Sequence, residues 1–123
     1  MSDVSFGVHG KALLLSAKRI GVISENIANS NTPGYKAKDI PFKSIMAGSS
    51  SRLSLTQSSG SHISLISRSQ MQFVVPNGPS LDGNTVDVES EKVKLLEATQ
   101  KYSQALEFVS GSIKARLKVI KGD

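Results

Sequence analysis

The side chains that most often carry chemistry in enzymes are scarce in this chain of 123 residues. It has no cysteine, which excludes disulfides, thiolate metal sites and cysteine nucleophiles. The two histidines, His9 and His62, do not form a metal-ligand spacing such as His-x-x-x-His. Abundant serine leaves a Ser-His-Asp triad open, but no Gly-x-Ser-x-Gly elbow accompanies it. We therefore predict a protein that is not an enzyme and holds no metal or cofactor, with both histidines on its surface.

Two further segments resemble ligand sites only in part. Residues 78–84 place Asp82 and Asn84 as a calcium loop would, but calcium needs about six or more oxygen ligands, and Asp82-Gly83 is ordinary turn chemistry. A basic segment occupies Lys114, Arg116, Lys118 and Lys121 in a chain of net charge +5. No aromatic residue interleaves these charges, as base-stacking modules require. A small basic helical protein that binds nucleic acid is the alternative function, and a hydrolase without an identified constellation is a second.

The first element is an amphipathic helix expected over residues 3–30. Its apolar line alternates spacings of four and three residues, the seam of a helix that packs on another helix: Leu13, Ala17, Ile20, Ser24 and Ile27. Three glycines lower its helix propensity by about 1 kcal/mol each relative to alanine. This helix should therefore need a partner.

A second helix is expected over residues 85–121, with Asn84 or Thr85 as its N-cap. Its seam is more regular: Leu95, Thr99, Tyr102, Leu106, Val109, Ile113 and Ile120. Acidic residues at its start and basic residues at its end suit the helix dipole. We expect neither helix to find a large partner face within its own chain, so association between chains is indicated.

The middle of the chain is expected to be irregular. Residues 43–70 are rich in serine and predict a loop. Short extended pieces are indicated where apolar and polar residues alternate, at Leu53 and Leu55 and at Ile63 and Leu65, and a strand is predicted over residues 72–75. The predicted fold is mainly α, with three segments: an N-terminal axial helix (1–32), a signature loop and irregular or β middle (33–84), and a C-terminal axial helix (85–123).

The first helix is followed by an unusual turn. Asn29, Asn31 and Thr32 are poor helix formers, and Pro33-Gly34 reverses the chain before Tyr35. The segment from Asn26 to Lys36 resembles the N-terminal signature of the flagellar axial proteins, which are the rod, hook and hook-junction subunits. Residues 38–42 and 80–89 are similar to the proximal rod subunits of that family, and the short chain suits them.

The resemblance implies a structural subunit of the flagellar basal-body rod, in the periplasm. Its terminal helices would pack with those of neighbours into a coiled-coil-like tube, and the chain would leave the cell unfolded through the type III export channel. The implied partners are copies of itself, other rod subunits, the adaptor between the MS ring and the rod, and the export gate, with no nucleic acid and no small-molecule substrate. The start of the chain predicts no cleavable signal peptide, and no apolar run approaches the roughly 20 residues of a membrane span.

The signature turn and the Phe42–Met46 segment can each be interpreted in two ways. The signature residues either mark a subunit boundary, with Tyr35 offering an apolar ring and a polar tip, or stabilise a local turn. Phe42 and Met46 form a Phe-x-x-x-apolar pattern that resembles the segment by which rod and hook subunits dock on the export gate. The structural alternative is that they pack on the rod body, one helical turn apart.

Overall fold

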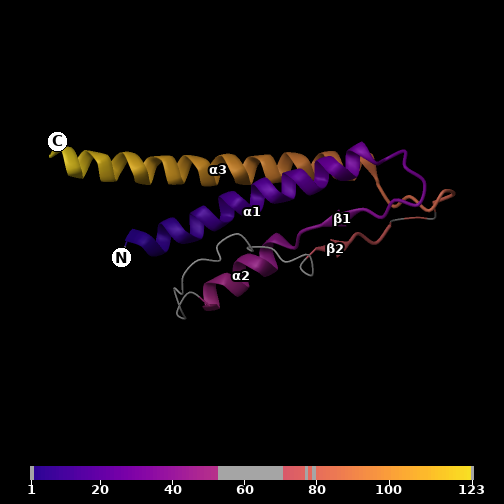
Figure 1. Ribbon diagram of the computed structural model, residues 1–123, viewed down its shortest axis with the longest axis horizontal. Helices are drawn as coiled ribbons and strands as arrows, with labels where there is room; N and C mark the ends of the chain where they lie inside the picture. The colour runs from indigo at the N-terminus through magenta and orange to yellow at the C-terminus, as the bar shows by residue number, and fades with distance from the viewer. Residues whose placement is uncertain (1, 53–70, 77, 79, 123) are drawn as a thin grey trace.

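Two long helices lie side by side in the computed structural model, which describes residues 2–52, 71–76, 78 and 80–122 (Figure 1). The elements in order are α1 (Ser2–Ala28), β1 (Lys38–Asp39), α2 (Phe42–Arg52), β2 (Gln72–Phe73) and α3 (Val88–Lys121). The predicted mainly α fold, with two long terminal helices and short β segments between them, is confirmed. Among the described residues, no helix is both long and apolar enough to cross a membrane.

The helices α1 and α3 form an antiparallel hairpin within one chain. Close to the turn, the Asn26 amide donates to the Glu91 carboxylate at 3.0 Å. Farther along, the rings of His9 and Phe108 stack with their centroids 3.5 Å apart. The expectation that neither helix finds a partner face in its own chain is therefore wrong. Association of these helices between chains stays a prediction.

The face that joins the two helices consists largely of small and polar side chains. On α3 the buried residues repeat every seven positions: Glu91, Ala98 and Ala105. On α1, Ser16 and Ile23 are also seven apart, and both are almost completely buried. The predicted seam of the first helix is one position away from this face: it contains Ala17 and Ser24, which are exposed, and omits Ser16 and Ile23.

The helix α2 corrects the expectation of a loop from residue 43 onward. Phe42, Ile45 and Met46 recur at helical spacing and pack against a cluster formed by Leu15, Val22 and Ile40. The ammonium group of Lys101 also lies 4.5 Å from the centre of the Phe42 ring. These tertiary contacts stabilise a helix that the serine-rich composition alone does not favour.

The two short strands pair in antiparallel register, with Lys38 opposite Phe73 and Asp39 opposite Gln72. The backbone N–H of Val74 extends the ladder by donating to the carbonyl of Ala37 at 2.9 Å. The predicted strand at 72–75 is thus present in shorter form. The extended pieces predicted around Leu53, Leu55, Ile63 and Leu65 lie outside the described residues, as does His62.

The ends of α3 carry the expected chemistry, with one correction. The N-cap is Asp87, whose carboxylate accepts from the backbone N–H of Ser90, and not Asn84 or Thr85. The helix ends at Gly122, which has the left-handed φ of 73°. Asn84 is not free to cap the helix because its amide is committed elsewhere, as described below.

Candidate functional site: a polar junction at the turn of the hairpin

The signature turn holds its own shape through local hydrogen bonds. The Asn29 side chain donates to the carbonyl of Glu25 at 2.8 Å and accepts from the Thr32 hydroxyl at 3.1 Å. The Tyr35 backbone N–H donates to the carbonyl of Thr32 at 3.2 Å. The end of α1 is thus held by Asn29, whose backbone N–H and side-chain amide both donate to the carbonyl of Glu25.

Asn84 joins this turn to the segment that leads into α3. Its amide nitrogen donates to the carbonyls of Asn29, Ser30 and Thr32 at 2.9, 3.1 and 2.7 Å. Its amide oxygen accepts from the backbone N–H of Val86 at 2.8 Å. The side chain is 8% exposed, so one buried amide ties the two ends of the hairpin turn together.

Two glycines meet at this junction, both with left-handed backbone. Gly34 has a φ of 74° and Gly83 a φ of 77°, which side chains with a Cβ rarely adopt. The N–H of Gly34 donates to the carbonyl of Asp82 at 2.9 Å, and the Lys36 ammonium donates to the carbonyl of Gly83 at 2.7 Å. A Cβ on Gly83 would stand 3.6 Å from the Cα of Gly34, an ordinary contact. The glycines are therefore required by backbone conformation and not by lack of space.

Asn26, which is fully buried, is the centre of a second polar network. Its amide nitrogen donates to the carbonyl of Lys38 at 2.6 Å and to the carboxylate of Glu91 at 3.0 Å. Its oxygen accepts from the N–H of Lys38 at 3.1 Å and from the Tyr35 hydroxyl at 3.3 Å. This one side chain connects α1, the strand β1, the signature turn and α3.

Charge is paired around the junction. The buried Glu91 carboxylate also accepts from the Lys94 ammonium at 3.1 Å. The Arg19 guanidinium donates two hydrogen bonds to the Asp39 carboxylate, at 3.0 and 3.1 Å, and this contact raises the pKa of the guanidinium. Burial raises the pKa of the Tyr35 hydroxyl, and nearby carboxylates add to the effect.

On the outer side, the Asp82 carboxylate shapes the next turn. The Ser80 hydroxyl and the Asn84 backbone N–H both donate to it, at 2.8 and 3.1 Å, and hold the pKa of Asp82 below its ordinary value. This arrangement confirms the predicted Asp-Gly turn.

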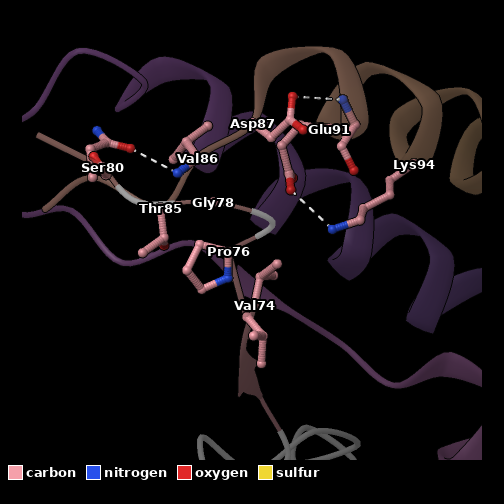
Figure 2. Close-up of a pocket in the computed structure, with 12 residues that line it drawn as sticks. Val74, Pro76, Gly78, Ser80, Thr85, Val86, Asp87, Glu91 and Lys94 are labelled. Atoms are coloured by element: carbon pink, nitrogen blue, oxygen red, sulfur yellow. Dashed lines mark hydrogen bonds and ion pairs between the residues drawn. The ribbon is translucent and has the colours of Figure 1, made fainter.

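A cavity of about 310 Å³ lies beside the junction at the start of α3. Figure 2 shows Val74 and Pro76, from the segment after β2, on one side, and Glu91 and Lys94 from α3 on another. Its acidic groups are engaged: Asp87 caps α3, and Glu91 pairs with Lys94. Nowhere in the described part of the chain do three His, Asp or Glu side chains lie close enough to hold a metal ion. The arrangement is suited to fixing backbone geometry and to packing.

Comparison with known proteins identifies the family. Residues 6–36 match the model of the flagella basal body rod protein family. The chain is 39% identical to the flagellar basal body rod protein FlgB of Aeromonas hydrophila, over 98% of this chain and 96% of that protein. It is 35% identical to the FlgB of Escherichia coli K12, over 97% and 94%, and 34% identical to that of Salmonella typhimurium LT2, over 98% and 95%. The chain belongs to the FlgB family of flagellar basal body rod proteins.

The family signature coincides with the junction. Of the predicted signature residues, Asn29, Thr32, Gly34 and Tyr35 all take part in its hydrogen bonds. The other two, Asn31 and Pro33, lie on its exposed side. The sequence did not predict that Asn26, Asn84 and Glu91 join the turn to the rest of the hairpin, and it placed Asn84 only as a candidate N-cap. The only feature of the sequence that pointed to Asn26 is its place as the first residue of the family motif.

The predicted assembly seam of the rod protein lies largely beside the buried face of the hairpin. Leu13, Ile20, Ile27, Leu95, Tyr102 and Val109 are half-buried, Ala17 is exposed, and Leu106 and Ile113 are each 46% exposed. The seam positions of α3 thus keep apolar area that α1 does not cover. Their burial between rod subunits stays a prediction.

The export-gate candidates of the rod protein lie on α2, in a helix and not in the flexible segment that was expected. Both Phe42 and Met46 are partly buried against the cluster of Leu15, Val22 and Ile40. In the folded chain they therefore pack as the structural alternative described. A role at the export gate would concern the unfolded chain and stays a prediction.

Proposed function

We propose that this chain is a structural subunit of the flagellar basal-body rod and that it polymerises through its terminal helices. The observation that supports this most is the apolar area left on α3 after α1 has packed on it. Eight large apolar side chains on this helix are 44–80% exposed: Val93, Leu96, Leu106, Phe108, Ile113, Leu117, Val119 and Ile120. Four of them, Leu106, Ile113, Leu117 and Ile120, follow one another at spacings of seven, four and three residues and so share one face of the helix. An exposed apolar stripe of this kind favours association.

The junction suits the same role. It fixes the turn of the hairpin through buried amide and carboxylate groups, so the two helices hold one relative position. A subunit that repeats in a regular array needs such a fixed shape, because each contact must recur in every copy. The family membership favours this role over the nucleic-acid-binding alternative and points away from catalysis.

The test of assembly is a charge placed in the proposed seam. Leu106→Asp, or Ile20→Asp, should abolish rod incorporation and motility while the monomer stays soluble, because the interface would bury an unpaired carboxylate. The matched control is Gln104→Asp, which puts the same charge on an exposed position two residues away. Normal swimming with Leu106→Asp would contradict assembly through the terminal helices.

We further propose that the chain reaches the periplasm through the flagellar export channel, without a cleaved signal, and works beside copies of itself, other rod subunits and the adaptor at the MS ring. The Phe42–Met46 segment is the proposed contact with the export gate while the chain is unfolded. Phe42→Ala with Met46→Ala should then block secretion at unchanged cytoplasmic levels. If the pair serves packing alone, a strain that cannot polymerise its rod should export the double variant as efficiently as the wild type.

A further inference from the structure

The last turns of α3 project beyond the helix that covers the rest of it. The two contacts that set the hairpin register place the first residue of α1 opposite about residue 115 of α3, since both helices rise equally per residue. Figure 1 shows this end of α3 reaching past the start of α1. We call residues 113–121 the tail of α3.

The tail carries the last part of the apolar stripe of α3. Ile113, Leu117 and Ile120 follow one another at spacings of four and three residues, so they lie on one face of the helix. They are 46%, 48% and 80% exposed, and the neighbouring Val119 is 80% exposed as well. The tail therefore presents several large aliphatic side chains to solvent in the single chain.

The lysines of the tail form a second stripe beside the apolar one. Lys114, Lys118 and Lys121 repeat the same spacing one position later, which places their stripe about 100° farther around the helix. All three are exposed, and no carboxylate within the described residues pairs with them. The only acidic residue after Glu107 is Asp123, so the tail is positively charged. Lysine stems can lie along an apolar surface while their ammonium groups stay in water.

We infer that the tail of the single, unassembled chain binds the surface of a bilayer that contains anionic phospholipid. The apolar stripe would enter the boundary between the headgroups and the acyl chains, and the ammonium groups of the lysine stripe would lie among the lipid phosphates. This arrangement is typical of helices that lie in a membrane interface. The tail is far shorter than the roughly 20 residues of a membrane span, so it would lie in the plane of the interface.

An anionic bilayer fits the tail better than nucleic acid does. Nucleic acid supplies phosphate for the lysines, but its bases are held by aromatic side chains, and residues 113–121 contain none. A bilayer surface supplies both negative charge and an apolar layer within reach of the two stripes. The inference goes beyond the proposed function and concerns the chain before assembly, because Ile113 cannot be buried in lipid and between rod subunits at the same time.

The first test is co-sedimentation of the purified full chain with vesicles. We expect binding to vesicles of equal parts phosphatidylcholine and phosphatidylglycerol, weakened as salt is raised and much weaker with phosphatidylcholine alone. Lys118→Glu with Lys121→Glu should reduce the affinity by about tenfold or more, because each lysine near an anionic surface contributes about fivefold. The matched control, Lys18→Glu with Lys43→Glu, makes the same change of net charge on exposed lysines of α1 and α2 and should bind like the wild type.

The apolar stripe is tested by a second pair of variants. Leu117→Ser with Ile120→Ser should also weaken binding to the mixed vesicles, since less apolar area enters the interface. The matched control is Val93→Ser with Leu96→Ser, which removes apolar side chains that are 60% and 63% exposed on α3 outside the tail. Thermal unfolding verifies that each variant keeps its fold. A wild type that does not bind the mixed vesicles, or a control pair that weakens binding as much as its tail pair, would overturn the inference.

The second test reports which part of the chain meets the lipid. The sequence has no cysteine, so Ile120→Cys and Leu96→Cys each carry one environment-sensitive fluorophore. With mixed vesicles the emission should shift to the blue at residue 120 and stay unchanged at residue 96. A shift at residue 96 alone, or binding to duplex DNA without binding to vesicles, would contradict a membrane role for the tail. Neither readout involves the rod, so such a result leaves the proposed function standing.

Discussion

Asn84→Ala is the sharpest perturbation of the junction. The amide has two N–H groups shared among three carbonyls, and one oxygen that accepts from Val86, so about three net hydrogen bonds are lost. At about 1 kcal/mol each, the loss would be about 3 kcal/mol. Part of this is recovered because the carbonyls belong to exposed or half-buried residues that water can reach. We therefore predict that the free energy of unfolding falls by roughly 2–3 kcal/mol.

The measurement is urea unfolding of the full chain. The midpoints of the variant and the wild type are compared provided that the free energy of unfolding falls with urea at the same slope in both. Asn31→Ala, in the exposed part of the same turn, is the matched control and should change stability by less than about 0.5 kcal/mol. Asn84→Asp keeps the shape of the side chain but points a carboxylate at three carbonyls. Folding should raise the pKa of that carboxyl, so the variant should regain stability as the pH falls. The role of the Asn84 amide in the junction would be refuted if Asn84→Ala lost less than about 0.5 kcal/mol of unfolding free energy and the stability of Asn84→Asp did not change with pH.

Two further predictions concern the backbone and the Tyr35 hydroxyl of the junction. Gly34→Ala and Gly83→Ala should each lower the free energy of unfolding by about 1–2 kcal/mol, because both positions have left-handed φ. Gly10 lies within α1 with open space around it, so Gly10→Ala should raise the free energy of unfolding by up to about 1 kcal/mol. Equal effects in urea titrations at all three positions would contradict this. Folding raises the pKa of the Tyr35 hydroxyl. The protonated hydroxyl therefore stabilises the fold below the unfolded-state pKa of about 10, and this stabilisation is lost as the pH rises through the folded-state pKa. Tyr35→Phe should therefore flatten the alkaline loss of stability, and an unchanged alkaline limb would speak against the burial of the hydroxyl.

The elements that rest on local sequence were predictable. Helical spacing of apolar residues located α1 and α3, and Pro33-Gly34 and Asp82-Gly83 located the two turns. The α2 helix was not predictable from its serine-rich composition, because contacts of Phe42 and Met46 with a distant cluster stabilise it.

The junction was beyond local reasoning for the same reason. Asn84 bonds to carbonyls 52 to 55 residues away, and Asn26 bonds to Glu91 across 65 residues. The sequence predicts Asn84 or Thr85 as the N-cap because these residue types favour that position, but only the fold brings the signature turn within reach of the Asn84 amide. The intramolecular face of α3 was missed because it is built on Ala98 and Ala105, which carry little hydrophobic signal.

The central claim, that the exposed apolar face of α3 becomes buried between rod subunits, is tested most directly by cysteine labelling. The chain has no native cysteine, so a single Ile113→Cys reports on one position. Ile113 is 46% exposed in the monomer, so a maleimide should label the purified variant readily. In isolated basal bodies the same position should be protected by at least about tenfold in rate, as expected for a side chain buried in a subunit interface. Equal labelling rates in the monomer and in assembled basal bodies would contradict assembly through this face.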